Sequence, residues 1–250
     1  MKLTRRQEEV LASPVVAAMD AVIVPHTRAE FGHALPAALE ARTRFVGPIA
    51  RRANAPAMAE LRARLGLTGF VLVSTPGGGG FEADSARLVD IARRVHTRLR
   101  PRIPSFRHVL VLGPNAPDPI SSGAAIEPVD DAMTVLASEP EMASLIACAD
   151  AVLSAGGYNS VSEIRLAKRP AFFLPGRRSH DDQRQRVEAM TAAGLAMVVN
   201  DADSDGAAAR VADGCLESGV LAAMRERYVT DVFEPGNTAA AREILACARR

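Results

Sequence analysis

The chain has 250 residues, of which 48% are hydrophobic and 24% are charged, and its formal net charge is +1. This length predicts one large domain or two small ones, and the composition excludes a disordered chain, a collagen-like fibre and a disulfide scaffold. The near-neutral charge and the lack of Trp argue against a surface that binds and stacks on nucleic acid, so we expect no nucleic-acid partner.

Cysteine and histidine usage points to a reducing compartment and to no metal. Cys148, Cys215 and Cys247 are far apart and form no CxxC pair. The five histidines lack the spacings of metal-ligating motifs. No segment approaches the ~20 apolar residues of a membrane helix, and the run 10–19 is only moderately apolar. We therefore expect a cytoplasmic protein without a signal peptide, with contact to a membrane surface left open.

Short apolar segments alternate with helical patterns. The segments are rich in Val, Ile, Leu and Phe, which predicts strands buried on both faces at 21–25, 44–46, 70–74, 109–112, 151–154, 171–174 and 196–199. Helices are predicted at 83–99, 138–149, 159–167, 182–193 and 238–248. This alternation predicts the α/β class, with a Rossmann-like, doubly wound parallel sheet. Ligands of such sheets bind beyond the carboxyl ends of the strands.

Other local patterns mark boundaries. Regular alternation begins only after residue 50, so residues 1–50 are predicted to be distinct from 51–250, although too few for an independent domain. Ser138 and Glu141 form a capping box, which predicts the start of the helix 138–149. The acidic stretch 200–206 is predicted to be a solvated loop. The arginines of one basic stretch suit a solvated helix end or a lipid-headgroup site, and these are Arg94, Arg98, Arg100 and Arg102.

The first loop that could bind a ligand is STPGGGG, residues 74–80, which follows a predicted strand and precedes a predicted helix. Glycines let a backbone approach an anion closely, and amides at a helix N-terminus favour negative charge. Thr75, Gly77, Gly78 and Gly79 are therefore candidates for binding phosphate. No GK[ST] follows, so the loop is not a P-loop, and a flexible turn is the alternative.

The second loop, SAGGYNSVSE at 154–163, also joins a strand to a helix. Gly156 and Gly157 leave room for a ligand, whereas Asn159 or Ser160 could simply cap the helix. Glu163 could accept hydrogen bonds from two sugar hydroxyls, as acidic residues do for ribose, or it could only favour the helix dipole.

The third loop, PGRRSHDDQ at 175–183, is a dense polar cluster after another strand. His180, Asp182 and Gln183 offer donors and acceptors that suit the hydroxyls of a pyranose. A solvated loop ending in an Asp-capped helix is the alternative. Together, the three loops favour a nucleotide-sugar site over a dinucleotide or ATP site.

Residues 147–195, which include GGYNSVSEI, resemble the C-terminal domain of family 28 glycosyltransferases. These enzymes have the GT-B fold and include the lipid II synthase of peptidoglycan assembly, and the GGYNSVSEI stretch is similar to a bacterial group of predicted glycosyltransferases. A looser resemblance extends from about residue 20 to the C-terminus. It implies that 51–250 form a donor-binding domain with a C-terminal helix, and that 1–50 are a remnant of an N-terminal acceptor domain and crossover.

The resemblance also implies the roles of single residues. Glu163 would hold the ribose, and Asp182 and Gln183 would read the donor sugar. The turn Ser138–Glu139 would pair with the base through its backbone. The groups expected to bind the diphosphate are Arg51, Gly156, Gly157, Asn159 and Ser160.

The implied activity is an inverting, metal-independent hexosyl transfer without a cofactor, from a UDP-linked donor such as UDP-GlcNAc to an unknown acceptor. Neither His26 nor His33 matches a catalytic base of the family. The chain would then be a fragment, a subunit that works with a separate acceptor-binding subunit, or a protein that binds nucleotide sugars without transfer. The alternatives are a GT-B epimerase or hydrolase and a non-catalytic interaction module.

Overall fold

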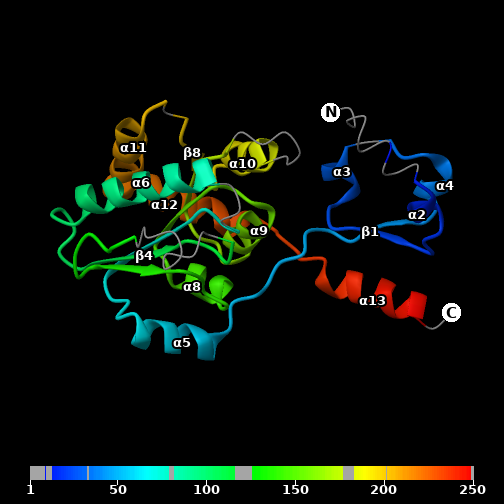
Figure 1. Ribbon diagram of the computed structural model, residues 1–250, viewed down its shortest axis with the longest axis horizontal. Helices are drawn as coiled ribbons and strands as arrows, with labels where there is room; N and C mark the ends of the chain where they lie inside the picture. Colours follow the sequence, from blue (N-terminus) through cyan, green and yellow to red (C-terminus); the bar gives the residue numbers. More distant parts are fainter. Residues whose placement is uncertain are drawn as a thin grey trace. The chain divides into compact units, whose positions relative to one another are not determined.

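The computed structural model describes residues 9, 13–32, 34–78, 82–115, 126–176, 183–200 and 202–248. The chain divides into two compact units, Met1–Ala50 with Phe233–Arg250, and Arg51–Val232 (Figure 1). This division differs from the expected domain 51–250, because the C-terminal helix lies with the N-terminal residues. The Gly236 N–H donates to the Pro48 carbonyl oxygen at 2.7 Å, and the Ala50 N–H donates to Asn237 Oδ1 at 3.2 Å.

The unit 51–232 is built on one parallel sheet of six strands. The strands are β3 (Phe70–Thr75), β4 (Phe106–Val111), β5 (Met133–Leu136), β6 (Ala151–Ser154), β7 (Ala171–Phe173) and β8 (Ala196–Val198). Their order is β5-β4-β3-β6-β7-β8, so the winding direction reverses between β3 and β6. The predicted α/β class and doubly wound sheet are confirmed.

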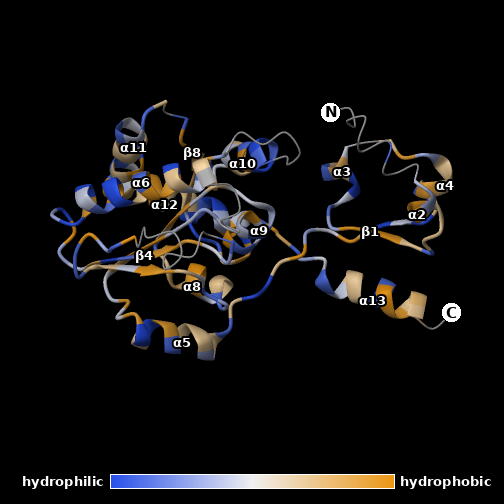
Figure 2. Ribbon diagram, viewed as in Figure 1, coloured by the Kyte–Doolittle hydropathy of each residue, from blue (hydrophilic) through white to orange (hydrophobic). Residues whose placement is uncertain are grey.

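Helices cover both faces of this sheet. They are α5 (Ala55–Arg64), α6 (Glu82–Leu99), α8 (Met142–Cys148), α9 (Tyr158–Leu166), α10 (Gln183–Ala192), α11 (Ser204–Leu216) and α12 (Ser218–Thr230). Leu72 of β3 packs in a core cluster with residues of α6 and α11, whereas Val71 and Val73 pack in a second cluster with residues of α5, α8 and α9. Successive side chains of a strand point to opposite faces, so one strand supplies both cores. Helix α6 shows alternating hydrophobic and hydrophilic colours in Figure 2, as expected for a helix with one buried face.

Three local predictions were wrong. Helix α8 begins at Met142, and its N-cap Glu141 makes no side-chain capping bond, so Ser138 starts no capping box. Helix α11 begins at Ser204, inside the stretch expected to be a loop, because Asp203 caps it by accepting a hydrogen bond from the Gly206 N–H at 2.7 Å. Strand β5 was not predicted, and three of its four residues are only partly buried at the edge of the sheet.

The other unit holds a parallel pair of strands and four short or medium helices among its described residues. These are β1 (Val22–Val24), β2 (Thr43–Phe45), α2 (Pro14–Ala17), α3 (Arg28–Phe31), α4 (Ala37–Glu40) and α13 (Asn237–Ala248). A Cβ on Gly236 would lie 2.0 Å from the Val46 carbonyl oxygen, so the approach to α13 packs directly on the segment after β2. Both strands match predicted ones.

Candidate functional site

The first candidate loop leaves the sheet where its winding reverses. Thr75 of β3 pairs with Ser154 of β6, and the two chains diverge from there into different loops. The buried Thr75 hydroxyl accepts a hydrogen bond from the Gly77 N–H at 3.0 Å, and Gly77 has a φ of +84° that favours glycine. A Cβ on Gly77 would lie 3.6 Å from Ser160 Oγ, so the first and second loops lie against each other.

The second loop leads into the N-terminus of α9, beside the first loop. Gly156 has a φ of +80°, and a Cβ there would come within 2.4 Å of a Val187 methyl group. Gly157 is the N-cap, makes no side-chain capping bond, and would place a Cβ in open space among the described residues. Asn159 and Ser160 lie inside the helix, so the interpretation that either caps it was wrong. Such an N-terminus attracts anions, because its first amides point outward and the helix dipole is positive there.

Glu163 lies on the second turn of α9 with only 4% of its side chain exposed. Arg51 Nε donates to Glu163 Oε1 at 2.7 Å, and Arg51 Nη1 donates to the Pro140 carbonyl oxygen at 3.0 Å. The expected contact of Arg51 with a diphosphate is therefore replaced, in this state, by a contact with the carboxylate expected to hold ribose.

The turn expected to read a base lies next to this ion pair. Glu139 accepts hydrogen bonds from Arg64 Nη2 at 2.6 Å and from the Glu141 N–H at 2.9 Å. The Glu139 side chain is therefore occupied by contacts within the protein, whereas Ser138 is exposed. The backbone of this turn is held from two sides, by Arg64 through Glu139 and by Arg51 through Pro140.

The third loop is described only at its two ends. Gly79, His180 and Asp182 lie outside the described residues, and Gln183 is buried at the start of α10. A Cβ on Gly176 would lie 2.1 Å from Asp84 Oδ2, so the start of this loop packs on the first turn of α6.

A residue that no sequence pattern had singled out lies against the first loop. The Asn115 N–H donates to the Gly78 carbonyl oxygen at 3.0 Å, and Asn115 Nδ2 would lie 3.6 Å from a Cβ on Gly78. The signal was present as a turn-forming Gly113-Pro114-Asn115 directly after a predicted strand.

Behind the first loop lies a buried pair of histidines that no sequence pattern had indicated. His108 Nε2 and Ser74 Oγ are 2.7 Å apart, and the His96 and His108 rings stack with centroids 5.6 Å apart. Burial, reinforced by His96, lowers the pKa of His108 to about 3. Burial also lowers the pKa of His96, although Asp130, 2.9 Å away, opposes this shift. Both rings are thus held neutral near pH 7.

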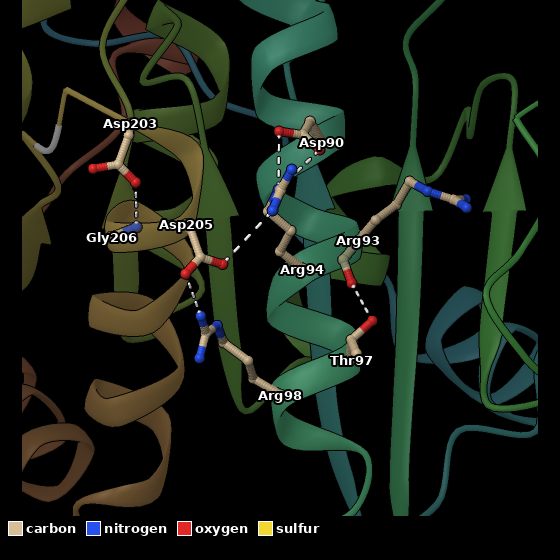
Figure 3. A network of polar contacts seen from close by, with 8 residues as sticks. All are labelled: Asp90, Arg93, Arg94, Thr97, Arg98, Asp203, Asp205 and Gly206. Atoms are coloured by element: carbon tan, nitrogen blue, oxygen red, sulfur yellow. Dashed lines mark hydrogen bonds and ion pairs between the residues drawn. The ribbon is translucent and has the colours of Figure 1, made fainter.

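Three of the four arginines of the basic stretch form ion pairs within the protein, Arg94 and Arg98 on α6 and Arg100 just after it. Arg94 contacts Asp90 and Asp205, and Arg98 contacts Asp205 at 2.7 Å, which joins α6 to α11 (Figure 3). Arg100 pairs with Asp130 at 3.3 Å. This pairing favours the solvated helix end over a lipid-headgroup site.

Among the described residues, no three His, Cys, Asp or Glu side chains are grouped so that they could hold a metal ion. No described helix combines the length and apolar character needed to cross a membrane.

Comparison with known proteins identifies the fold. The family model of the glycosyltransferase family 28 C-terminal domain matches residues 79–227. No curated protein sequence matches the chain. Three similar structures are the calicheamicin glycosyltransferase CalG4 (TM-score 0.56, 19% identity, 98% of this chain and 62% of that chain), the spinosyn forosaminyltransferase SpnP (0.56, 16%, 94% and 57%) and Phytolacca americana UGT2 (0.54, 18%, 93% and 54%).

These likenesses concern the fold, because the identities are low. The six-stranded parallel sheet with its helices is that of a GT-B glycosyltransferase C-terminal domain. The chain spans less than two thirds of each of these three proteins, between 54% and 62% of their length.

Proposed function

Since the chain belongs to glycosyltransferase family 28 through its C-terminal domain, we propose that residues 51–232 bind the nucleotide-sugar donor of a hexosyl transfer. The observation that carries this proposal is the N-terminus of α9, which has no side-chain cap and is open at Gly157. The buried Glu163 carboxylate lies on the second turn of the same helix. One element thus offers an anion-binding end and an acceptor for hydroxyls, which are the two groups that a nucleoside diphosphate needs.

The donor would lie along the carboxyl edge of β3 and β6. Its diphosphate would be bound by the amides of Gly156 and Gly157 and by the first turn of α9, with the glycine loop after β3 beside them. Glu163 would accept the ribose hydroxyls, and the backbone of 138–139 would face the base. The third loop, which contains Gln183, would read the sugar. UDP-GlcNAc is the proposed donor, and kinship with the lipid II synthase group stays a prediction.

The proposed chemistry is a direct displacement with inversion. The bond between the anomeric carbon and the diphosphate oxygen breaks while a bond to an acceptor oxygen forms, and the acceptor proton passes to a base. Charge then accumulates on the departing diphosphate, where the α9 amides and helix dipole would stabilise it. No metal is needed for this role in the proposed mechanism.

The acceptor and the base are proposed to come from another polypeptide segment or subunit. Residues 1–50 would be the end of an acceptor domain, which the parallel pair β1 and β2 supports. A cytoplasmic location is supported by free thiols at Cys148, Cys215 and Cys247.

Calorimetric titration of the full chain with UDP, dTDP and GDP, each with and without a sugar, tests the proposal. We expect micromolar binding of UDP and UDP-sugar, and affinity weakened by roughly 10- to 100-fold in Glu163→Ala. Glu226→Ala removes an exposed carboxylate on α12 and serves as the matched control, with unchanged binding. A folded wild-type chain that binds none of the nucleotides would overturn the proposal.

A further inference from the structure

Arg51 connects two parts of the proposed nucleotide site. Its Nε bonds to Glu163 on α9 and its Nη1 bonds to the Pro140 carbonyl oxygen in the turn 138–141. The two partners lie on opposite sides of α8 in sequence, and Arg51 lies 112 positions from Glu163. A guanidinium is planar and presents its donors in a fixed fork, so these two bonds fix the turn and the carboxylate relative to each other.

The ion pair is strongly asymmetric in burial. The Glu163 side chain is 4% exposed, whereas that of Arg51 is 59% exposed. A buried carboxylate that has lost its charged partner is unfavourable, so Glu163 would reorient if Arg51 were removed. A rotated Glu163 would turn its oxygens away from the ribose hydroxyls, whereas a carboxylate held at one oxygen keeps further lone pairs for them.

We propose that Arg51 is a positioning residue for the nucleoside, which holds the Glu163 carboxylate in place and aligned with the turn 138–141, and that it does not bind the diphosphate. This inference rests on the proposed function, because it presupposes that Glu163 accepts the ribose. It assigns Arg51 to the recognition of ribonucleotides against their 2′-deoxy analogues.

Comparing UDP with 2′-deoxy-UDP separates the two roles of Arg51. A hydrogen bond from a ribose hydroxyl to a charged group is worth a factor of roughly 10 to 100 in affinity, so the wild-type chain should prefer UDP by about that factor. In Arg51→Gln the preference should fall below about threefold, and the affinity for UDP should fall more than that for 2′-deoxy-UDP, which keeps its diphosphate contacts and has only one of the two ribose hydroxyls. Arg52→Gln, at the exposed neighbouring position, should leave both affinities unchanged.

Two further variants test whether Arg51 acts through Glu163. In a Glu163→Gln background, Arg51→Gln should have no further effect on UDP binding, since the carboxylate it holds is gone. Arg51→Lys keeps the charge but not the fork, so it should restore the preference for UDP only in part. Thermal melting of each variant, followed by far-ultraviolet circular dichroism, confirms that it is folded.

The outcomes are distinct. Equal weakening of UDP and 2′-deoxy-UDP in Arg51→Gln, with the preference intact, would assign Arg51 to the diphosphate and overturn the inference. Additive losses in the double variant, or a wild-type chain that binds both nucleotides equally, would also overturn it. A wild-type chain that binds neither nucleotide would refute the proposed function itself.

Discussion

Acidification should destabilise the unit 51–232 through His108. The imidazole of His108 is buried in β4 with a pKa of about 3, whereas the usual value is 6.5. Between these two values the unfolded chain binds a proton that the folded chain does not. The contribution of His108 to stability is therefore fully present above pH 6.5 and is lost progressively as the pH falls toward 3.

The size of this effect follows from the difference between the two pKa values. At pH 4.5, two units below the unfolded value, the loss from His108 alone is about 3 kcal/mol, since one pKa unit corresponds to about 1.4 kcal/mol. Native proteins are stable by only about 5–15 kcal/mol. A single buried histidine should thus remove a large fraction of the stability.

The assay is urea unfolding at pH 7 and pH 4.5 for the wild-type chain and for His108→Gln. The chain contains no Trp, so far-ultraviolet circular dichroism is the suitable signal. Glutamine is neutral at both pH values and can still form a hydrogen bond with Ser74 Oγ. The wild-type chain should lose about 3 kcal/mol more than the variant between the two pH values. His96 and the carboxylates remain in both proteins, so their contributions largely cancel, and an equal loss in both would refute the reasoning.

Three other substitutions have defined outcomes. Gly156→Ala should cost about 3 kcal/mol in the free energy of unfolding, because its φ is +80° and the new methyl group would meet Val187 at 2.4 Å. Gly157→Ala is its matched control and should unfold like the wild-type chain. It should bind UDP at least about fivefold more weakly, because its Cβ would enter only the space proposed for the diphosphate. Unchanged affinity would place the diphosphate elsewhere. Asp205→Asn should lower stability by less than about 1 kcal/mol, and this loss should vanish in 1 M salt, because the pair is exposed; a salt-independent loss would contradict this.

Local patterns determined the elements around the site. Strands β3 and β6 were predicted from continuous apolar runs, since a strand buried on both faces has no polar alternation. Helix α6 was predicted from its apolar stripe. The resemblance of 147–195 indicated the family, and the matched family model confirms it. The starts of two helices were mispredicted because the pattern does not show which residue caps. Ser138 could cap a helix but does not, whereas Asp203 caps α11.

The tertiary structure decided which of these elements meet. No local sequence pattern predicts that β3 neighbours β6 or that the loop at Gly77 lies on Ser160, because strand order depends on how the whole unit packs. The pairing of Arg51 with Glu163 is of the same kind. By itself, the sequence determined the fold class, the positions of the first two loops and the family, since these depend on short-range periodicity and motif. Contacts between residues far apart in the chain form only when the sheet and its helices close around a common core.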